Sequence, residues 1–172
     1  MAPRPMAWPD RAIEAEPGGC DRLKIRECLM RYCRALDCAD SHVLASCYWP
    51  DGPAAAFVEQ AVPALRAMRR ALHKIGNVLI ELDGEEARVE SFVVAYHSLP
   101  DSLGGAEAVV GGRWIDRFEK RAGVWRIASR RFQLDWCRNV APGEGWSEAL
   151  YGLPAGMPAG AMAMRAAGSL SA

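Results

Sequence analysis

The second half of the chain alternates strand-like runs with short turn sequences, and this pattern constrains the fold more than any other feature. Runs rich in β-branched and aromatic residues occupy residues 77–82, 86–99, 108–121 and 123–139. The segments between them, DGEE, PDSLGG and RAG, are typical of hairpin connections. Because connections this short join antiparallel neighbours, the runs predict an antiparallel meander.

Helical patterns fill the first half of the chain. Residues 21–37 place apolar side chains largely at helical spacing, with Asp21 at the expected N-cap. A second, short helix is expected from Asp40, and a third over residues 56–75, before the first strand. Helices followed by an antiparallel meander predict an α+β domain.

The size and charge of the chain exclude several classes of protein. A chain of 172 residues suits one hydrophobic core and one site. Lys+Arg and Asp+Glu number 21 each and no basic block is interleaved with aromatics, so a nucleic-acid partner is not expected. No apolar run is long enough for a signal peptide or a membrane span, so we expect a cytoplasmic protein with no membrane partner.

The two ends of the chain lack the periodicity of the middle. Residues 1–19 mix Pro, Gly and charge, which predicts a flexible N-terminal extension. Residues 141–172 are rich in Ala, Gly and Met, which predicts a tail or a flap over a pocket mouth. The folded domain is therefore expected at residues 20–140.

The six cysteines are expected to be reduced, since the chain is too long to need a disulfide scaffold and has no secretion signal. Cys28, Cys33 and Cys38 recur at five-residue steps, which form neither a CxxC pair nor one helical face. No histidine stands at zinc-finger spacing from them. We therefore expect small buried thiols rather than a structural zinc site.

Two of the three histidines are candidates for a site. His97 shares a strand face with small and apolar residues, as the inside of a pocket should. His73 stands where the third expected helix ends, at the open end of the expected sheet. Taken alone, a histidine on such a face is more often a hydrogen-bonded core residue than a catalyst.

The position of Asp37 favours a catalytic role for a histidine over a structural one. It falls at the C-terminal end of the first expected helix, where the macrodipole disfavours a carboxylate by roughly 0.3–1 kcal/mol. A histidine that becomes imidazolium during a reaction would compensate this carboxylate, which in turn would raise the basicity of the imidazole. His73 and Asp37 are therefore a candidate acid/base dyad. The alternative is that Asp37 only caps the next turn beside Asp40.

Three further residues are constrained by geometry. Tyr32 precedes Asp37 by five residues, about 140° around an ideal helix, so both reach one pocket only if it wraps the helix end. Arg130 and Arg131 are adjacent on the last expected strand, so one must face each side of the sheet. One of these two guanidinium groups is expected to point inward.

Four sequence blocks, RYCRALDCADSHVLASCYWPD, LHKIGNVLIELDG, VVAYH and GGRWIDRFEKRAGVWRIASRR, together resemble the SnoaL-like branch of the nuclear transport factor 2 superfamily over residues 20–139. Its members include scytalone dehydratase, bile acid 7α-dehydratase and hexachlorocyclohexane dehydrochlorinase. The resemblance implies a cone-shaped, curved mixed sheet wrapped around a long N-terminal helix, with an internal pocket. The chain departs from this pattern after Gly52, where the short strand that relatives usually carry is missing.

The resemblance also implies a cofactor-independent lyase acting on a small hydrophobic alcohol of aromatic, steroid or polyketide-like type. The implied reaction is a dehydratase-type elimination or a retro-aldol C–C cleavage. The alternatives are a hydrophobic-ligand-binding or accessory subunit, or an isomerase on the same fold. The residues it implies are His73, Asp37, Tyr32 and Arg130 for catalysis and His97 at a polar pocket position. With His97, we take Trp114, Tyr48 and Arg131 as candidates for substrate binding.

No cofactor or metal is expected. The alternative is an iron site in which His73, His97 and Asp37 form a two-His-one-carboxylate triad. We consider it the weaker reading, because few further carboxylates are expected on the inward faces to orient such ligands.

The outward side of the expected sheet is apolar. Phe92, Val94 and Tyr96 form a set that a lone soluble domain would not comfortably expose. Members of the SnoaL-like family, which the chain resembles, form dimers or trimers through this face of the sheet. We therefore expect the chain to bind copies of itself, as a homodimer or a homotrimer.

Overall fold

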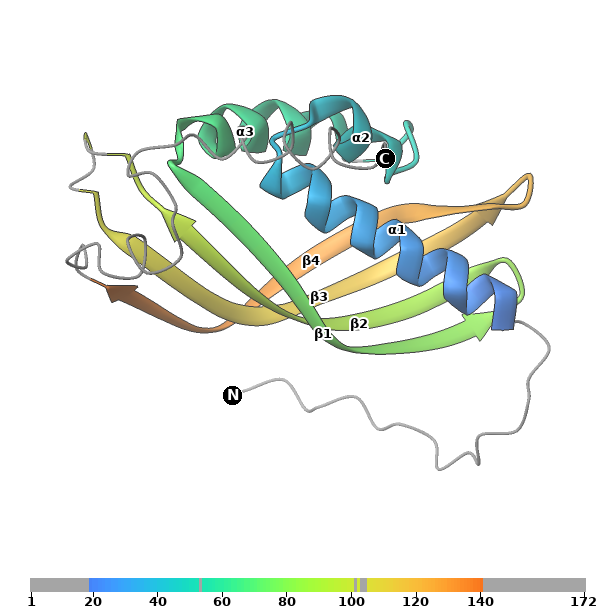
Figure 1. Cartoon of the computed structure of the whole chain (residues 1–172). Helices are drawn as coiled ribbons and strands as arrows, with labels where there is room; N and C mark the ends of the chain where they lie inside the picture. The colour runs from blue at the N-terminus through green and yellow to red at the C-terminus, as the bar shows by residue number, and fades with distance from the viewer. Residues whose placement is uncertain (1–18, 53, 101, 103–104, 141–172) are drawn as a thin grey trace, which may run out of the picture.

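A computed structural model describes residues 19–52, 54–100, 102 and 105–140 of the chain (Figure 1). The expected C-terminal tail or flap, and the expected N-terminal extension apart from Gly19, lie outside the described residues. Within the described part, three helices precede four strands. They are α1 (Gly19–Asp37), α2 (Ser41–Ser46), α3 (Ala54–Ala67), β1 (Arg70–Asp83), β2 (Glu86–Ser98), β3 (Glu107–Arg121) and β4 (Val124–Val140).

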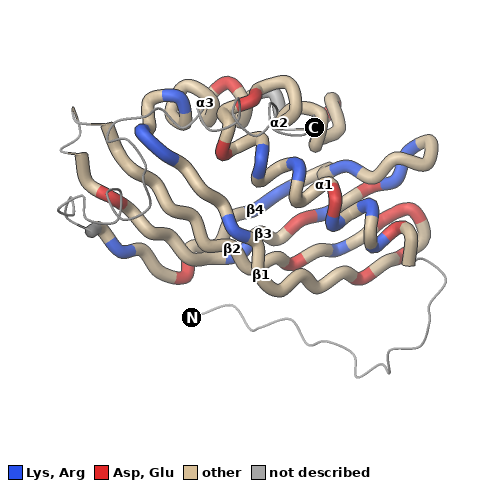
Figure 2. The backbone as a smooth tube through the Cα atoms, in the orientation of Figure 1, with Lys and Arg blue, Asp and Glu red and all other residues tan. Residues whose placement is uncertain are grey.

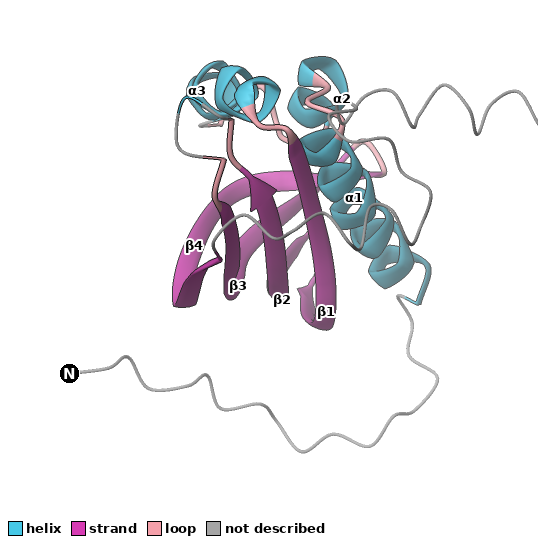
Figure 3. Ribbon diagram, turned by 60° about the vertical axis from the view of Figure 1, so that its left-hand side comes forward, coloured by secondary structure: helices cyan, strands magenta, loops and turns pink. Residues whose placement is uncertain are grey.

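The four strands form one antiparallel sheet in the order β1-β2-β3-β4. The sheet is curved, and the helices lie on one side of it, which we call the inner face (Figures 1 and 3). Among the described residues, the parallel pairing expected of a mixed sheet is reduced to an isolated bridge between Tyr48 and Ile127. The α+β class, the curved sheet and the long N-terminal helix are confirmed.

Helix α1 forms the core with the inner face of the sheet. Ile25, Leu29 and Tyr32 recur at spacings of three and four residues and are buried on one side of the helix. They belong to the same apolar cluster as Phe118 of β3 and Trp125 of β4. This burial stabilises the domain by roughly 25 cal/mol per Å² of apolar surface, and it fixes the C-terminal end of α1 over the sheet.

The cysteines are free thiols, as expected, and all six lie within the described residues. The Cys28 thiol donates to the carbonyl oxygen of Cys47 at 3.6 Å. The Cys47 thiol donates to the carbonyl oxygen of Val43 at 3.4 Å. These two buried thiols therefore pack α1 against the end of α2.

The expected third helix is wrong at its C-terminal end. Helix α3 stops at Ala67 and β1 begins at Arg70, so residues 70–75 are strand instead of helix. They pair with residues 93–98 of β2, and these ladder hydrogen bonds outweigh the helical spacing of the apolar side chains. His73 therefore stands within a strand, which sets the direction of its side chain.

The loop between α2 and α3 replaces the strand that the family pattern places there. The described part of this loop contains no strand, as expected from the sequence. Instead, the Trp49 N–H donates to the Ile127 carbonyl at 3.0 Å, and the Ile127 N–H donates to the Cys47 carbonyl at 2.9 Å. These two bonds hold the intervening Tyr48 against β4.

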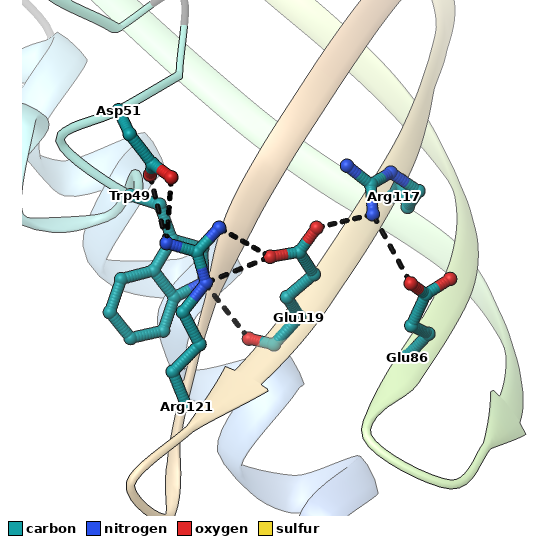
Figure 4. Close-up of polar contacts among 6 residues, drawn as sticks. All are labelled: Trp49, Asp51, Glu86, Arg117, Glu119 and Arg121. Carbon is teal, nitrogen blue, oxygen red and sulfur yellow. Dashed lines mark hydrogen bonds and ion pairs between the residues drawn. The ribbon is translucent and has the colours of Figure 1, made fainter.

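A polar cluster on the β3–β4 hairpin reinforces this attachment (Figure 4). The Arg121 guanidinium lies 4.6 Å from the centre of the Trp49 ring and donates to both oxygens of Asp51 at 2.9 Å. The Trp49 ring nitrogen donates to the Glu119 carbonyl at 3.1 Å. The loop that carries Tyr48 is thus anchored on both sides of that residue.

Charged residues of both signs are interspersed along α1 and the strands (Figure 2). None of the described helices is long and apolar enough to cross a membrane.

Candidate functional site

A cavity of about 500 Å³ lies between the helices and the inner face of the sheet. Five of the side chains that line it are polar: Tyr32, Tyr48, His73, His97 and Arg130. The rest of the wall is apolar or aromatic and comprises Leu36, Phe57, Ala61, Ala64, Leu65, Met68, Val93, Ala95, Val110, Trp114 and Phe132. A mainly apolar wall with a few convergent polar groups is the usual composition of a small-molecule site.

Asp37 and His73 are hydrogen-bonded at the edge of this cavity. Asp37 is the last residue of α1, and its Oδ1 accepts from His73 Nδ1 at 2.8 Å and from the His73 backbone N–H at 2.8 Å. The His73 side chain is only 9% exposed. Because a carboxylate can only accept, Nδ1 carries the proton of the neutral imidazole, and the Nε2 lone pair is left to act as a base.

His97 faces His73 from the neighbouring strand β2. The two ring centres are 5.2 Å apart in an edge-to-face arrangement. Burial lowers the pKa of His97 below its ordinary value, and the neighbouring His73 lowers this pKa further. At neutral pH, His97 is therefore an uncharged ring that offers one donor and one acceptor to a molecule in the cavity.

Arg130 reaches the cavity from β4. Its Nε and Nη2 donate to the two carboxylate oxygens of Asp116 at 2.7 and 2.6 Å. Its guanidinium carbon lies 4.0 Å from the centre of the Tyr32 ring and 4.2 Å from the centre of the Trp114 ring. Burial opposes the charge, but the Asp116 carboxylate holds the pKa of Arg130 above its usual range. The cavity wall therefore contains a permanent positive charge.

Tyr32 and Tyr48 bring two hydroxyl groups to the same wall. The Tyr48 hydroxyl donates to the Tyr32 hydroxyl at 3.3 Å. Burial raises the pKa of both phenols, so both keep their protons at neutral pH. Since Tyr32 accepts in this bond, its own hydroxyl hydrogen remains available to a ligand.

The structure brings together every candidate residue named from the sequence except Arg131. Trp114 takes part through its ring, which stacks on His73 with the ring centres 6.4 Å apart. Arg131 is exposed and does not line this cavity; it lines a second groove of about 610 Å³, to which Arg130 also contributes. Because adjacent strand residues face opposite sides, the inward arginine is Arg130, and Arg131 lies on the outer face of the sheet.

The sequence analysis missed Asp116, whose side chain is 0% exposed. A signal for it existed, because Trp114, Asp116 and Phe118 alternate along β3 and so share the inward face. A carboxylate on an apolar face requires a partner, and Asp116 lies directly opposite Arg130 in the β3–β4 register.

Within the residues that the structure describes, no group of three His, Cys, Asp or Glu side chains is arranged to hold a metal ion. The side chains of these types described at or near the cavity wall are those of His73, His97 and Asp37. His73 and Asp37 form a hydrogen-bonded pair, and the His97 ring faces the His73 ring.

The sequence of the chain matches a known protein family. Residues 20–131 match the sequence profile of the SnoaL-like domain. No protein with a curated description matches the chain. Among solved structures, a protein of unknown function from Mycobacterium tuberculosis is 28% identical, with a TM-score of 0.59 over 67% of this chain and 72% of that protein.

Two further solved structures share the fold at lower identity. A hexachlorocyclohexane dehydrochlorinase from Novosphingobium barchaimii is 16% identical, with a TM-score of 0.63 over 72% of this chain and 92% of the other. A candidate scytalone dehydratase from Novosphingobium aromaticivorans is 20% identical, with a TM-score of 0.60 over 73% and 94% of the two chains. Similarity at this level shows the fold and leaves the reaction to be argued from the site.

Proposed function

The chain belongs to the SnoaL-like domain family, and on that premise we propose that it is a cofactor-independent lyase acting on a small hydrophobic alcohol. The mainly apolar wall supports a hydrophobic substrate of aromatic, steroid or polyketide-like type. A cavity of about 500 Å³ also lies within the size range of ordinary small-molecule sites. The proposed reaction is an elimination that removes water.

The observation that carries this proposal is the hydrogen bond between Asp37 and His73 Nδ1. It leaves Nε2 of His73 free to take a proton from a carbon atom of the substrate. Asp37 stabilises the imidazolium that forms and keeps the ring in the required tautomer. Acid–base assistance of this kind accelerates a reaction by about 10²–10⁴-fold.

The remaining polar groups have roles in the same reaction. Tyr32 or His97 donates a hydrogen bond to the departing hydroxyl group, since each is uncharged and has a hydrogen to donate. The proton that His73 took from carbon leaves with this hydroxyl group as water, which restores the neutral imidazole. Arg130 stabilises the negative charge that develops as the proton leaves, because its own charge is fixed in the cavity wall.

A retro-aldol cleavage would use the same base. His73 would then take the proton from a substrate O–H, and a C–C bond would break to release a small aldehyde. The products distinguish the two reactions, because dehydration yields one molecule lighter by one water and cleavage yields two fragments.

The proposal is tested by incubating the purified protein with racemic aryl and steroid alcohols and measuring mass changes. The substitutions His73→Ala and Asp37→Asn are expected to reduce turnover by about 10²–10⁴-fold. Arg131→Gln on the outer face serves as the control and is expected to retain turnover. Full turnover in both dyad variants would remove the dyad from the account. Binding without conversion of any alcohol would favour the non-catalytic alternative.

We further propose that copies of the chain associate through the outer face of the sheet. Leu72, Phe92, Val94 and Trp136 are 57%, 41%, 43% and 49% exposed. The strand register directs these side chains away from the cavity. Burial of such a patch against a second copy would remove apolar surface from water.

A further inference from the structure

Arg130 is held by two sets of contacts that leave it little freedom. Its Nε and Nη2 are both bonded to Asp116, at 2.7 and 2.6 Å. The two aromatic rings that flank it, Tyr32 and Trp114, are themselves edge-to-face with centres 5.2 Å apart. The guanidinium therefore occupies the corner between two fixed rings, and Asp116 sets its rotation within that corner.

The hydrogen bonds to Asp116 also determine which guanidinium nitrogen of Arg130 has no hydrogen-bond partner. Nη1 of Arg130 is buried and has no hydrogen-bond partner within the described part of the chain. Arg130 contributes to the wall of the cavity of about 500 Å³, whereas Asp116 does not; both residues also line the groove of about 610 Å³. Asp116 thus engages two of the three nitrogens of Arg130, and the hydrogens of Nη1 remain unbonded.

Stability alone is a weak explanation for the buried ion pair between Asp116 and Arg130. Removing two charges from water costs free energy that their attraction recovers only in part, so an apolar pair of similar volume often does as well. The side chains of Asp116 and Arg130 are 0% and 8% exposed, so this cost applies in full. Because Arg130 also lines the cavity, the pair can act on the site as well as on packing.

We propose that Asp116 is a positioning residue that fixes the Arg130 guanidinium for the reaction, without touching the substrate itself. This inference rests on the proposed function, in which Arg130 stabilises developing negative charge. Orientation matters because a displacement of about 1 Å at a reacting group can cost about 10²-fold in rate. Asp116→Asn keeps the shape of the side chain but turns one strong acceptor into a donor facing Arg130, so the guanidinium is repelled from its present orientation.

The first measurement needs no substrate. The Arg130 Nε–H is buried and bonded to Asp116, so it should exchange slowly with water and give a protected side-chain signal in ¹H–¹⁵N spectra. The signal is assigned by its loss in Arg130→Lys. We expect it to vanish in Asp116→Asn and to persist in Asp135→Asn, which breaks a comparable bidentate pair with Arg113 on the outer face. Persistence of the signal in Asp116→Asn would overturn the proposal.

The second measurement separates positioning from a general structural role. With the alcohol identified in the mass screen, Asp116→Asn should lower kcat by about 10²-fold at nearly unchanged KM. Adding Arg130→Lys to Asp116→Asn should reduce kcat no further than Arg130→Lys alone, because both substitutions remove the same interaction. Additive losses, or an unchanged kcat per folded molecule, would contradict positioning.

Asp116→Glu covers the case in which Asp116→Asn does not fold, because it keeps the charge and moves the carboxylate by one methylene group. It is expected to fold, to shift the Arg130 signal and to lower kcat, and wild-type values for both would overturn the proposal. Failure of the proposed function would be visible separately, as full turnover in His73→Ala, while the signal of Arg130 would still report on Asp116.

Discussion

Strands β3 and β4 carry two bidentate Arg–Asp pairs, one on each face of the sheet. Arg130 binds Asp116 on the inner face, and Arg113 binds Asp135 on the outer face. The inner side chains are 8% and 0% exposed, whereas the outer ones are 24% and 32% exposed. The chemistry of the two pairs is the same, so their different surroundings must decide what each one does.

The outer pair exchanges its contacts with water at little cost, which is typical of surface ion pairs. The inner pair cannot do so, because burial removes the competing water and strengthens every charge interaction. The Arg130 guanidinium of the inner pair is also next to Tyr32 and Trp114, so its positive charge lies in the cavity wall. Our proposal assigns the reaction to the inner face, and contact with solvent or with a second copy to the outer face.

The stability difference between the two pairs is the largest effect that we expect. Arg130→Met leaves the Asp116 carboxyl buried without a partner, and it should lower the free energy of unfolding by about 3–5 kcal/mol. Asp135→Ala on the outer face, which leaves Arg113 its second partner Glu90 at 3.6 Å, should lower it by about 0.2–1 kcal/mol. Urea unfolding monitored by circular dichroism measures both, and equal losses would contradict the difference between the faces.

Two neighbouring glycines of β3 also have different surroundings on the two faces of the sheet. A Cβ on Gly112 would meet the Gln133 carbonyl oxygen and, at 2.8 Å, the Phe132 ring on the inner face. A Cβ on Gly111 would meet the Trp136 ring on the outer face. Gly112→Ala should therefore destabilise the protein by about 1–3 kcal/mol, since backbone must move. Gly111→Ala should cost less, because the exposed Trp136 ring can turn away, and the reverse order in thermal unfolding would be inconsistent with this account.

Association tests the outer face directly. Light scattering at micromolar concentration should give a multiple of the 18.8 kDa chain mass. Val94→Lys should reduce the measured mass, because it places a charge within the outer apolar patch. Val124→Lys, at a position of similar exposure on the β3–β4 hairpin, is the matched control and should leave the mass unchanged. A monomer for the unmodified chain would refute self-association.

The smallest effect concerns the pH dependence of stability. Burial lowers the pKa of His97 relative to the unfolded chain, where an imidazole titrates near about 6.5. Below that value the unfolded state binds more protons than the folded state, so stability is lost as the pH falls. The melting temperature should therefore fall less between pH 8 and pH 5 in His97→Gln than in the unmodified protein. Identical falls would mean that His97 does not titrate differently on folding.

The sequence predicted the fold better than it predicted the strand boundaries. The α+β class followed from hairpin connections that are short enough to force antiparallel pairing. The start of β1 was missed because Ala71, Leu72 and Ile75 extend the apolar spacing of α3, and only pairing with β2 reveals that they belong to a strand. Such pairing is a long-range contact that local spacing does not report.

The sequence predicted only those site residues whose role follows from a local pattern or from the family resemblance. The place of Asp37 at a helix C-terminus and the family resemblance both named His73 and Asp37, and the structure places them within hydrogen-bond distance. Adjacency in the sequence does not show which of Arg130 and Arg131 points inward, because the direction of each side chain depends on the register of β4 with β3. Asp116 was missed for the same reason, since its partner lies across a hairpin and not along the chain.

The central claim is that Asp37 prepares His73 as a base, and the tautomer of the His73 ring tests it most directly. Long-range ¹H–¹⁵N spectra distinguish the two ring nitrogens of a neutral imidazole by their chemical shifts. The account predicts that His73 carries its proton on Nδ1 and has a bare Nε2, and that Asp37→Asn abolishes this preference. A proton on Nε2 in the unmodified protein, unchanged in Asp37→Asn, would contradict it.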